Sequence, residues 1–324
     1  MQFSFAPMEG ITSCFFRRIH AACFPGVDRY WAPFLAPDGS GRCKEGAWRD
    51  LRPENNPGAL PVPQILCNKA EAFLSVAREL AAMGYTEVNL NAGCPSATVV
   101  PKHKGAGMLQ DLRSLDDFLA DVFSRCELSI SVKTRLGLAS AAEFPAILEV
   151  YRRYPLAELI VHARDRAGMY RSAPDLAAFS AALPACPFPV CYNGSITDPA
   201  SLAAVQSAAP GLERVMLGRG AAADPALFRE LRGGAPLGAE ELRDFLARYE
   251  AVLSASGIGE HYTLGRLKEL WFYLAVNFPG DAKGLKRLRK AQTLPDYRAA
   301  VAALFAGDGF RPGAWGSADA RSLT

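Results

Sequence analysis

The sequence has few of the features that mark metal-binding, secreted or membrane-spanning proteins. Its eight cysteines include no Cys-x-x-Cys pair, and with only four histidines it shows no spacing typical of a zinc site. No apolar run reaches the ~18 residues that span a bilayer. The first six residues lack the basic and apolar regions of a signal peptide. We therefore expect a cytoplasmic protein with neither a membrane segment nor a metal site.

The net charge is also small, because 36 basic residues stand against 33 acidic ones and leave a formal charge of +3. Such a balance neither requires nor excludes a nucleic-acid partner, since local clusters of charge decide that binding. No Gly-x-Gly-x-x-Gly motif follows the first expected strand, which disfavours a dinucleotide-binding open sheet.

Short apolar runs alternate with longer amphipathic stretches, a pattern typical of βαβ units. The expected strands are Phe3–Pro7, Arg29–Phe34, Val62–Leu66, Glu87–Asn91, Ser129–Lys133, Leu159–His162, Val190–Asn193 and Val215–Gly218. The expected helices between them are Lys69–Met83, Leu115–Arg125, Ala141–Tyr154, Ser201–Ala208 and Ala223–Leu231. Eight strands in this span are close to the ~250 residues typical of a (β/α)8 TIM barrel. A doubly wound open sheet is the alternative.

A Gly- and Pro-rich break at residues 232–238 separates this region from a purely helical one. Helical periodicity covers Ala239–Ser254, Thr263–Val276, Ala282–Gln292 and Pro295–Phe305. We therefore expect a barrel domain over residues 1–234 and a small all-α domain over residues 235–306. The Gly-, Ser- and Ala-rich residues 307–324 are expected to form a disordered tail.

Polar residues follow most of the expected strands at their C-terminal ends, where the active site of a barrel lies. They are Pro7-Met8-Glu9, Gln64, Asn89, Asn91, Lys133, His162, Asn193-Gly194 and Gly218-Arg219. A lysine that ends a buried strand needs a partner, and Lys133 suits a flavin or phosphate oxygen. The glycines after the last two strands, with Arg219, suit a phosphate. A salt-bridged structural Lys133 and a core His162 are the alternatives.

Cys94 lies just beyond the fourth expected strand. Gly93 and Pro95 hold its thiol on a stiff turn, and the basic segment Lys102-His103-Lys104 follows in the same loop. The positive charge of this basic segment favours a thiolate at Cys94 or a contact with phosphate. An inert small side chain is the alternative, and it is the interpretation we take for the other seven cysteines.

Six segments together resemble the tRNA-dihydrouridine synthases, in the order of that family. They are Ala6-Pro7-Met8-Glu9-Gly10, Asn89-Leu90-Asn91-Ala92-Gly93-Cys94-Pro95, Val132-Lys133-Thr134-Arg135-Leu136-Gly137, Val161-His162-Ala163-Arg164, Asn193-Gly194 and Gly218-Arg219-Gly220. The helical region is similar to the family's tRNA-binding domain, so the resemblance covers nearly the whole chain.

The resemblance implies FMN bound at the barrel mouth, NADPH as its reductant, and a D-loop uridine of tRNA as substrate. The uridine would be extruded into the mouth, where reduced FMN gives a hydride to C6 and Cys94 gives a proton to C5. The implied cofactor contacts are Pro7, Met8, Glu9, Gln64, Lys133, His162, Asn193, Gly194, Ser195, Gly218 and Arg219. The implied substrate contacts are Asn91, Tyr170 and Arg171.

Two strips of the helical region are candidate tRNA contacts. The segment Lys283–Lys290 holds five basic residues and no acid, with Lys286 and Arg287 at its centre. The segment Thr263–Trp271 carries Arg266 and Lys268, and it resembles a helix of the bacterial C-type synthases, which act on position 16. A solvated helix face is the alternative interpretation for both strips.

Two other functions fit parts of this pattern. A flavin barrel acting on a free pyrimidine, such as a dihydroorotate or dihydropyrimidine dehydrogenase, shares Lys133 and the phosphate loops but has no need for residues 239–305. A non-catalytic RNA-binding barrel has no need for Cys94, Gln64 or Asn91. We expect a monomeric flavoenzyme with tRNA and NADPH as its partners.

Overall fold

The computed structural model describes residues 1–58, 60–169, 172–313 and 315–316. The chain divides into two compact units that interleave along the sequence. The barrel unit comprises residues 1–7, 28–195 and 203–216, and the helical unit comprises residues 8–27, 196–202 and 217–324.

Eight parallel strands form one sheet in the order β2-β1-β8-β7-β6-β5-β4-β3. They are β1 (Gln2–Phe5), β2 (Arg29–Tyr30), β3 (Gln64–Ile65), β4 (Glu87–Ala92), β5 (Ser129–Gly137), β6 (Leu159–Asp165), β7 (Val190–Asn193) and β8 (Arg214–Leu217). Two isolated parallel bridges, Trp31 with Val62 and Leu35 with Ile65, join the β2 and β3 regions. These bridges close the sheet into a barrel, so the predicted (β/α)8 fold is confirmed and the open sheet is excluded.

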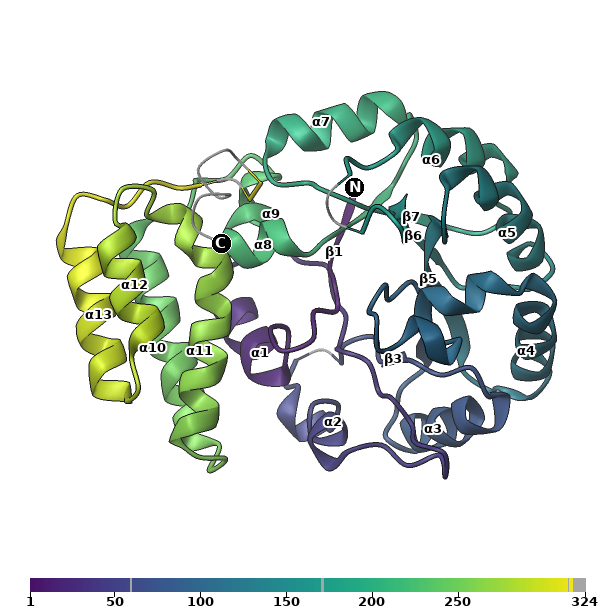
Figure 1. The fold of residues 1–324 in the computed structure, drawn as a ribbon, viewed down its shortest axis with the longest axis horizontal. Coiled ribbons are helices and arrows are strands. Elements are labelled where there is room, and N and C mark those ends of the chain that lie inside the picture. The colour runs from purple at the N-terminus through teal and green to yellow at the C-terminus, as the bar shows by residue number, and fades with distance from the viewer. Residues whose placement is uncertain (59, 170–171, 314, 317–324) are drawn as a thin grey trace. The chain divides into compact units, whose positions relative to one another are not determined.

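Apolar side chains fill the barrel because its strands are buried on both faces. One core cluster contains residues from β6, β7 and β8, from the bridge between the β2 and β3 regions, and from the residue after β1: Ala6, Trp31, Val62, Ile160, Cys191 and Met216. The helices α3 (Ala70–Ala82), α4 (Leu112–Arg125), α5 (Phe144–Tyr151) and α6 (Leu176–Ala182) follow successive strands and lie outside them (Figure 1). The remaining helices of this part are α2 (Glu45–Arg49) and α7 (Pro199–Ala208).

All eight strands overlap the predicted segments, but β2 and β3 are shorter than predicted, and β5 and β6 extend further. β5 continues from Lys133 to Gly137, through a segment that includes Arg135. Arg135 is 1% exposed, and its guanidinium donates to the carbonyls of Gly93, Asp165 and Met169 at 2.8, 3.0 and 3.3 Å. A buried cation is tolerated here because backbone oxygens surround it.

The helical unit contains the four predicted C-terminal helices. They are α10 (Ala239–Ala255), α11 (Glu260–Leu274), α12 (Ala282–Lys290) and α13 (Leu294–Ala306). The unit also contains α1 (Cys14–Cys23), α8 (Arg219–Ala223) and α9 (Leu227–Glu230), and α1 had no counterpart in the sequence prediction. Among the described residues, no helix is both long and apolar enough to cross a membrane.

An aromatic core joins α1 to α10 within this unit. His20 is fully buried, its ring lies 5.4 Å from that of Phe24, and Phe245 meets Phe24 edge-on at 5.3 Å. The Nε2 of His20 lies 2.9 Å from the carbonyl of Pro225, so this nitrogen carries the hydrogen. Burial lowers the pKa of His20 to about 3, and the imidazole is neutral at physiological pH.

Part of the segment after α13 contacts the helical unit. The Arg311 amide donates to the Asn277 carbonyl at 2.8 Å, and the Gly313 amide donates to Asn277 Oδ1 at 2.9 Å. The predicted tail therefore begins with ordered contacts as far as residue 313. Residues 317–324 lie outside the described part of the chain.

Candidate active site

The strand register places the predicted site residues of the barrel unit side by side. Gln64 on β3 pairs with Asn89 on β4, and Asn91 pairs with Lys133 on β5. His162 on β6 pairs with Asn193 on β7. Because the strands are parallel, these positions share the C-terminal end of the barrel, where barrel enzymes bind their substrates.

Lys133 is half-buried, and its amine is held by an amide. Its Nζ donates to Asn193 Oδ1 at 2.8 Å, and Asn193 Nδ2 in turn donates to the Met216 carbonyl at 2.8 Å. Burial, together with repulsion from Arg135, lowers the pKa of Lys133 to about 8. An anion bound close to this amine would favour its charged form and raise its pKa.

His162 is positioned by a residue to which the sequence prediction gave no role. Arg164 lies two residues further along β6, and its Nη1 is 2.9 Å from His162 Nε2. Arginine has only donors, so Nε2 of His162 must accept this hydrogen bond. The same guanidinium donates to Ser195 Oγ at 3.0 Å and to the Ser172 carbonyl at 2.7 Å. The alternation of side chains along a strand could have indicated Arg164, because residues 162 and 164 share a face.

Gln64, Asn89 and Asn91 form a chain of buried amides. Asn91 Nδ2 donates to Gln64 Oε1 at 2.7 Å, and Gln64 Nε2 donates to Asn89 Oδ1 at 2.7 Å. The three side chains are 1%, 0% and 7% exposed in the order Gln64, Asn89, Asn91. Each amide therefore has one defined orientation at the floor of the barrel mouth.

Cys94 follows β4 and is partly exposed. Its backbone N–H donates to Asn91 Oδ1 at 2.9 Å, and its carbonyl accepts from the Ala106 amide at 3.0 Å. Gly105 packs directly behind it with φ +56°, and a Cβ at Gly105 would come within 2.9 Å of the Cys94 Cβ. The thiol therefore projects from a fixed backbone, as the sequence predicted.

The other predicted cofactor residues are placed as follows. Pro7 belongs to the barrel unit, and Gly194 follows Asn193 at the end of β7. Met8, Glu9, Gly218 and Arg219 belong to the helical unit, where the Met8 carbonyl closes a turn with Thr12 and Gly218 precedes α8. Tyr170 and Arg171 lie outside the described residues.

The predicted tRNA-contact residues of the helical unit fall into two groups. Arg266 donates to the Gly10 carbonyl at 3.0 Å and pairs with Glu269 at 2.8 Å. Lys268 donates to the Ala291 carbonyl at 3.0 Å. These two side chains hold the unit together. Lys286 and Arg287 on α12 are exposed instead.

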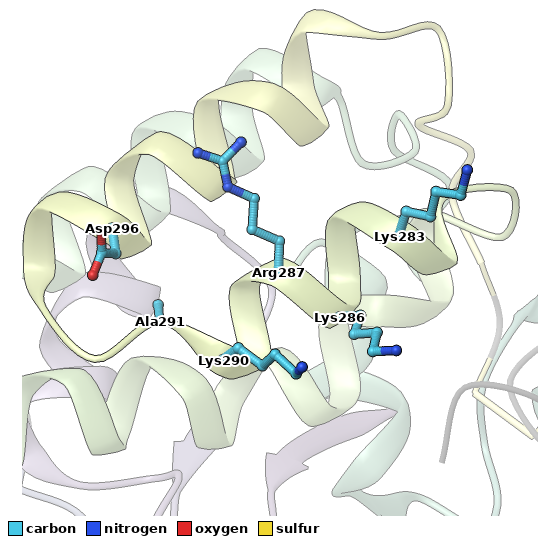
Figure 2. A pocket seen from close by; sticks show the side chains of 6 residues that line it. All are labelled: Lys283, Lys286, Arg287, Lys290, Ala291 and Asp296. Carbon is cyan, nitrogen blue, oxygen red and sulfur yellow. The ribbon is translucent and has the colours of Figure 1, made fainter.

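Lys286 and Arg287 line a hollow of about 440 Å³ with Lys283, Lys290, Ala291 and Asp296 (Figure 2). The cations occupy positions i, i+3, i+4 and i+7 of α12, opposite the buried Leu285 and Leu288. No contact of the described residues pairs any of these four cations with an acid. Some exposed arginines elsewhere are paired with an acid, as Arg125 is with Glu71 and Arg248 is with Asp244.

Sequence and structure comparisons extend these observations. The sequence profile of the family described as Dihydrouridine synthase (Dus) matches residues 4–263. A Rhodobacter capsulatus protein named "Probable tRNA-dihydrouridine synthase" is 30% identical over 310 residues, covering 91% of this chain and 93% of the relative. A Shigella flexneri protein named "tRNA-dihydrouridine(16) synthase" is 29% identical over 76% of this chain and 79% of its own length. A Pseudomonas putida "tRNA-dihydrouridine synthase B" is 27% identical over 77% and 75% of the two chains.

Among solved structures, morphinone reductase superposes with a TM-score of 0.51 at 13% identity, over 74% of this chain and 87% of its own. An old yellow enzyme from Trypanosoma cruzi superposes with a TM-score of 0.52 at 10% identity, over 78% and 93%. Similarity at this level supports the barrel fold alone.

A closed parallel barrel with cations, amides and a thiol at its C-terminal mouth defines a (β/α)8-barrel enzyme. The profile match over most of the chain and the 30% identical relative narrow that class. The chain belongs to the dihydrouridine synthase family. It is thus an oxidoreductase of the flavin-dependent class.

Proposed function

We propose that this enzyme reduces the C5–C6 double bond of a D-loop uridine in tRNA, with FMN as its bound cofactor and NADPH as its reductant. The observation that carries the proposal is the fixed thiol of Cys94 beside the amides and the amine of the barrel mouth. The names of the relatives, which are tRNA-dihydrouridine synthases, support the same reaction.

The barrel mouth fits a flavin mononucleotide. A negative charge beside Lys133 would stabilise its charged amine. A flavin phosphate or the electron-rich pyrimidine edge of the ring would supply that charge. Arg164 and Ser195 add a buried donor fork close by, and Gln64 adds an amide. When bound, FMN supplies the hydride that reduces C6 after NADPH has reduced the flavin. Met8, Glu9, Gly218 and Arg219 are proposed as further contacts from the family resemblance alone.

The role of Cys94 is that of a general acid. Its thiol is partly exposed on a loop with a fixed backbone, so it can approach a base placed in the mouth. In its thiol form, Cys94 carries a proton that it can release to C5. Asn91 orients the Cys94 backbone and has a second N–H that is suited to a uracil carbonyl. Tyr170 and Arg171 are proposed substrate contacts as well.

The basic face of α12 favours tRNA over a free pyrimidine as the substrate. Four exposed cations on one helix face repel one another, and like charges at i,i+4 cost about 0.2–0.5 kcal/mol per pair. Phosphates of a bound RNA would relieve this repulsion, whereas a free pyrimidine would not reach it. We propose Lys286 and Arg287 as phosphate contacts. Arg266 and Lys268 contact the protein itself, so position 16 of the D-loop stays a prediction from the resemblance.

The test of this proposal is the replacement of Cys94. We expect Cys94→Ala to retain bound flavin and NADPH-dependent flavin reduction. Dihydrouridine formation on unmodified tRNA should fall by about 10²–10⁴-fold, the contribution typical of a general acid. Cys126→Ala is the matched control, because Cys126 is a partly exposed free thiol at the end of α4. Full activity of Cys94→Ala would overturn the proton-donor role, and a purified protein that cannot be reconstituted with FMN would overturn the whole assignment.

A further inference from the structure

The peptide bond that precedes Cys94 is held at both of its polar atoms. Its carbonyl, on Gly93, accepts from Arg135 Nε at 2.8 Å. Its N–H, on Cys94, donates to Asn91 Oδ1 at 2.9 Å. With the next peptide held through the Cys94 carbonyl, which accepts from the Ala106 amide at 3.0 Å, these contacts fix the backbone on which the Cys94 Cβ stands.

The hydrogen bonds that hold the N–H side of this peptide continue through buried side chains of the barrel strands. Asn91 is fixed by Gln64, and Gln64 is fixed by Asn89, as described above. Asn89 Nδ2 then donates to Ser131 Oγ at 3.0 Å, and the Ser131 hydroxyl donates to Glu87 Oε1 at 2.8 Å. Glu87 in turn pairs with Arg29 at 2.6 Å. Ser131 and Asn89 are both completely buried.

This chain of hydrogen bonds can run in only one direction. At the Cys94 end stand backbone N–H groups, which only donate, so Asn91 must face them with its oxygen. At the other end stands the Glu87 carboxylate, which only accepts, so Ser131 must donate to it. Each amide between the two ends is thereby oriented without ambiguity, and bonds in such a series strengthen one another.

We infer that Arg135 and Asn89 are positioning residues for Cys94, with Ser131 and Glu87 anchoring the second arm. Neither Arg135 nor Asn89 needs to touch the substrate. Arg135 holds the peptide carbonyl directly, and Asn89 holds the peptide N–H through Gln64 and Asn91. This inference rests on the proposed function only in that a misaligned thiol would slow proton transfer.

The variants that test the inference are Asn89→Leu and Arg135→Lys. Asn89→Leu keeps the branched shape and the number of side-chain heavy atoms, and it removes the amide at the centre of the chain. Arg135→Lys keeps the charge but replaces the planar fork with one amine, which cannot hold Gly93 and the Asp165 and Met169 carbonyls together. Tyr151→Phe is the matched control, because its buried hydroxyl donates to Thr134 Oγ1 at 3.1 Å on β5 and lies outside the chain.

Two readouts are made on the flavin-loaded enzyme. Amide hydrogen exchange at Cys94, followed by NMR, should be about fivefold faster in both variants, the factor expected for losing one hydrogen bond of typical net strength. The kcat for dihydrouridine formation should fall at least as much with KM for tRNA unchanged, because alignment of the thiol matters in the transition state. Tyr151→Phe should lose comparable thermal stability and leave both readouts at their native values.

Native exchange at Cys94 in a folded Asn89→Leu or Arg135→Lys enzyme would overturn the inference. So would a lower kcat without faster exchange, or equal effects of Tyr151→Phe. If Asn89→Leu does not fold, Ser131→Ala removes the anchor and should speed exchange at Cys94 in the same direction. An active Cys94→Ala enzyme would overturn the proposed function, and it would leave the exchange result intact, so the two failures are distinguishable.

Discussion

Replacing Lys133 with methionine removes the charged amine at the mouth and keeps most of its length. The folded protein lowers the pKa of this amine from 10.5 to about 8. A difference of that size corresponds to about 3 kcal/mol between the charged and neutral forms. The folded-state pKa lies below the unfolded one, so the charged amine destabilises the folded state below pH 8. That destabilisation fades as the pH rises from 8 to 10.5.

We predict that the difference in free energy of unfolding between the native protein and Lys133→Met depends on pH. We expect the free energy of unfolding of the native protein, relative to Lys133→Met, to rise by up to about 3 kcal/mol between pH 7.5 and pH 10.5. Groups other than Lys133 titrate in both proteins, so they cancel in the difference.

The assay is urea unfolding of the cofactor-depleted protein at a series of pH values, followed by far-UV circular dichroism. Lys69→Met is the control, because Lys69 is exposed at the start of α3 and should give a flat difference. Saturating FMN should flatten the Lys133 curve, since a neighbouring anion restores the charged form. A flat curve for Lys133→Met without cofactor would show that the amine is fully solvated and would refute the reasoning.

Two further predictions concern the helical unit. His20→Leu should flatten the acid limb of the stability curve: the pKa of His20 is lowered from 6.5 to about 3, so its contribution is complete above pH 6.5 and about 5 kcal/mol is lost as the pH falls toward 3. Equal acid sensitivity in acid-titration unfolding of both proteins would contradict this. Lys286→Glu with Arg287→Glu should weaken tRNA binding about tenfold or more at moderate salt and reduce the salt slope by about 1–2, with flavin reduction by NADPH unchanged. The ion-paired Arg248→Glu is the control, and an unchanged slope in filter binding would show that the strip is only a solvated face.

The sequence predicted the strands well because a parallel barrel buries both faces of each strand, which leaves continuous apolar runs. Val190–Asn193 was placed to the residue. β5 was cut short at Lys133 because Arg135 looks like a polar boundary until the carbonyls that receive it are known. α6 was missed because seven residues of mostly alanine carry little helical periodicity.

The positions of the candidate site residues were predictable from the sequence, and their hydrogen-bond partners were not. Strand ends can be counted along a chain, so Gln64, Asn91, Lys133 and Asn193 could be named. Which amide faces which depends on the register between strands, and nothing local to Gln64 indicates Asn89 as its partner. The same limit applies to Arg266 and Lys268, whose contacts with the Gly10 carbonyl, Glu269 and the Ala291 carbonyl could not be read from the sequence.

The way in which the barrel closes affects where its sheet opens most easily in local unfolding. Two isolated bridges, and not a continuous ladder, join β2 to β3, through Trp31 with Val62 and Leu35 with Ile65. Few hydrogen bonds have to break for this seam to part, so the barrel opens here at a lower free energy than between β4, β5 and β6. Gln64 lies on β3 at the edge of the seam. The strand that parts first is therefore the one that carries the middle amide behind Cys94, and fluctuations of the seam reach the thiol through it.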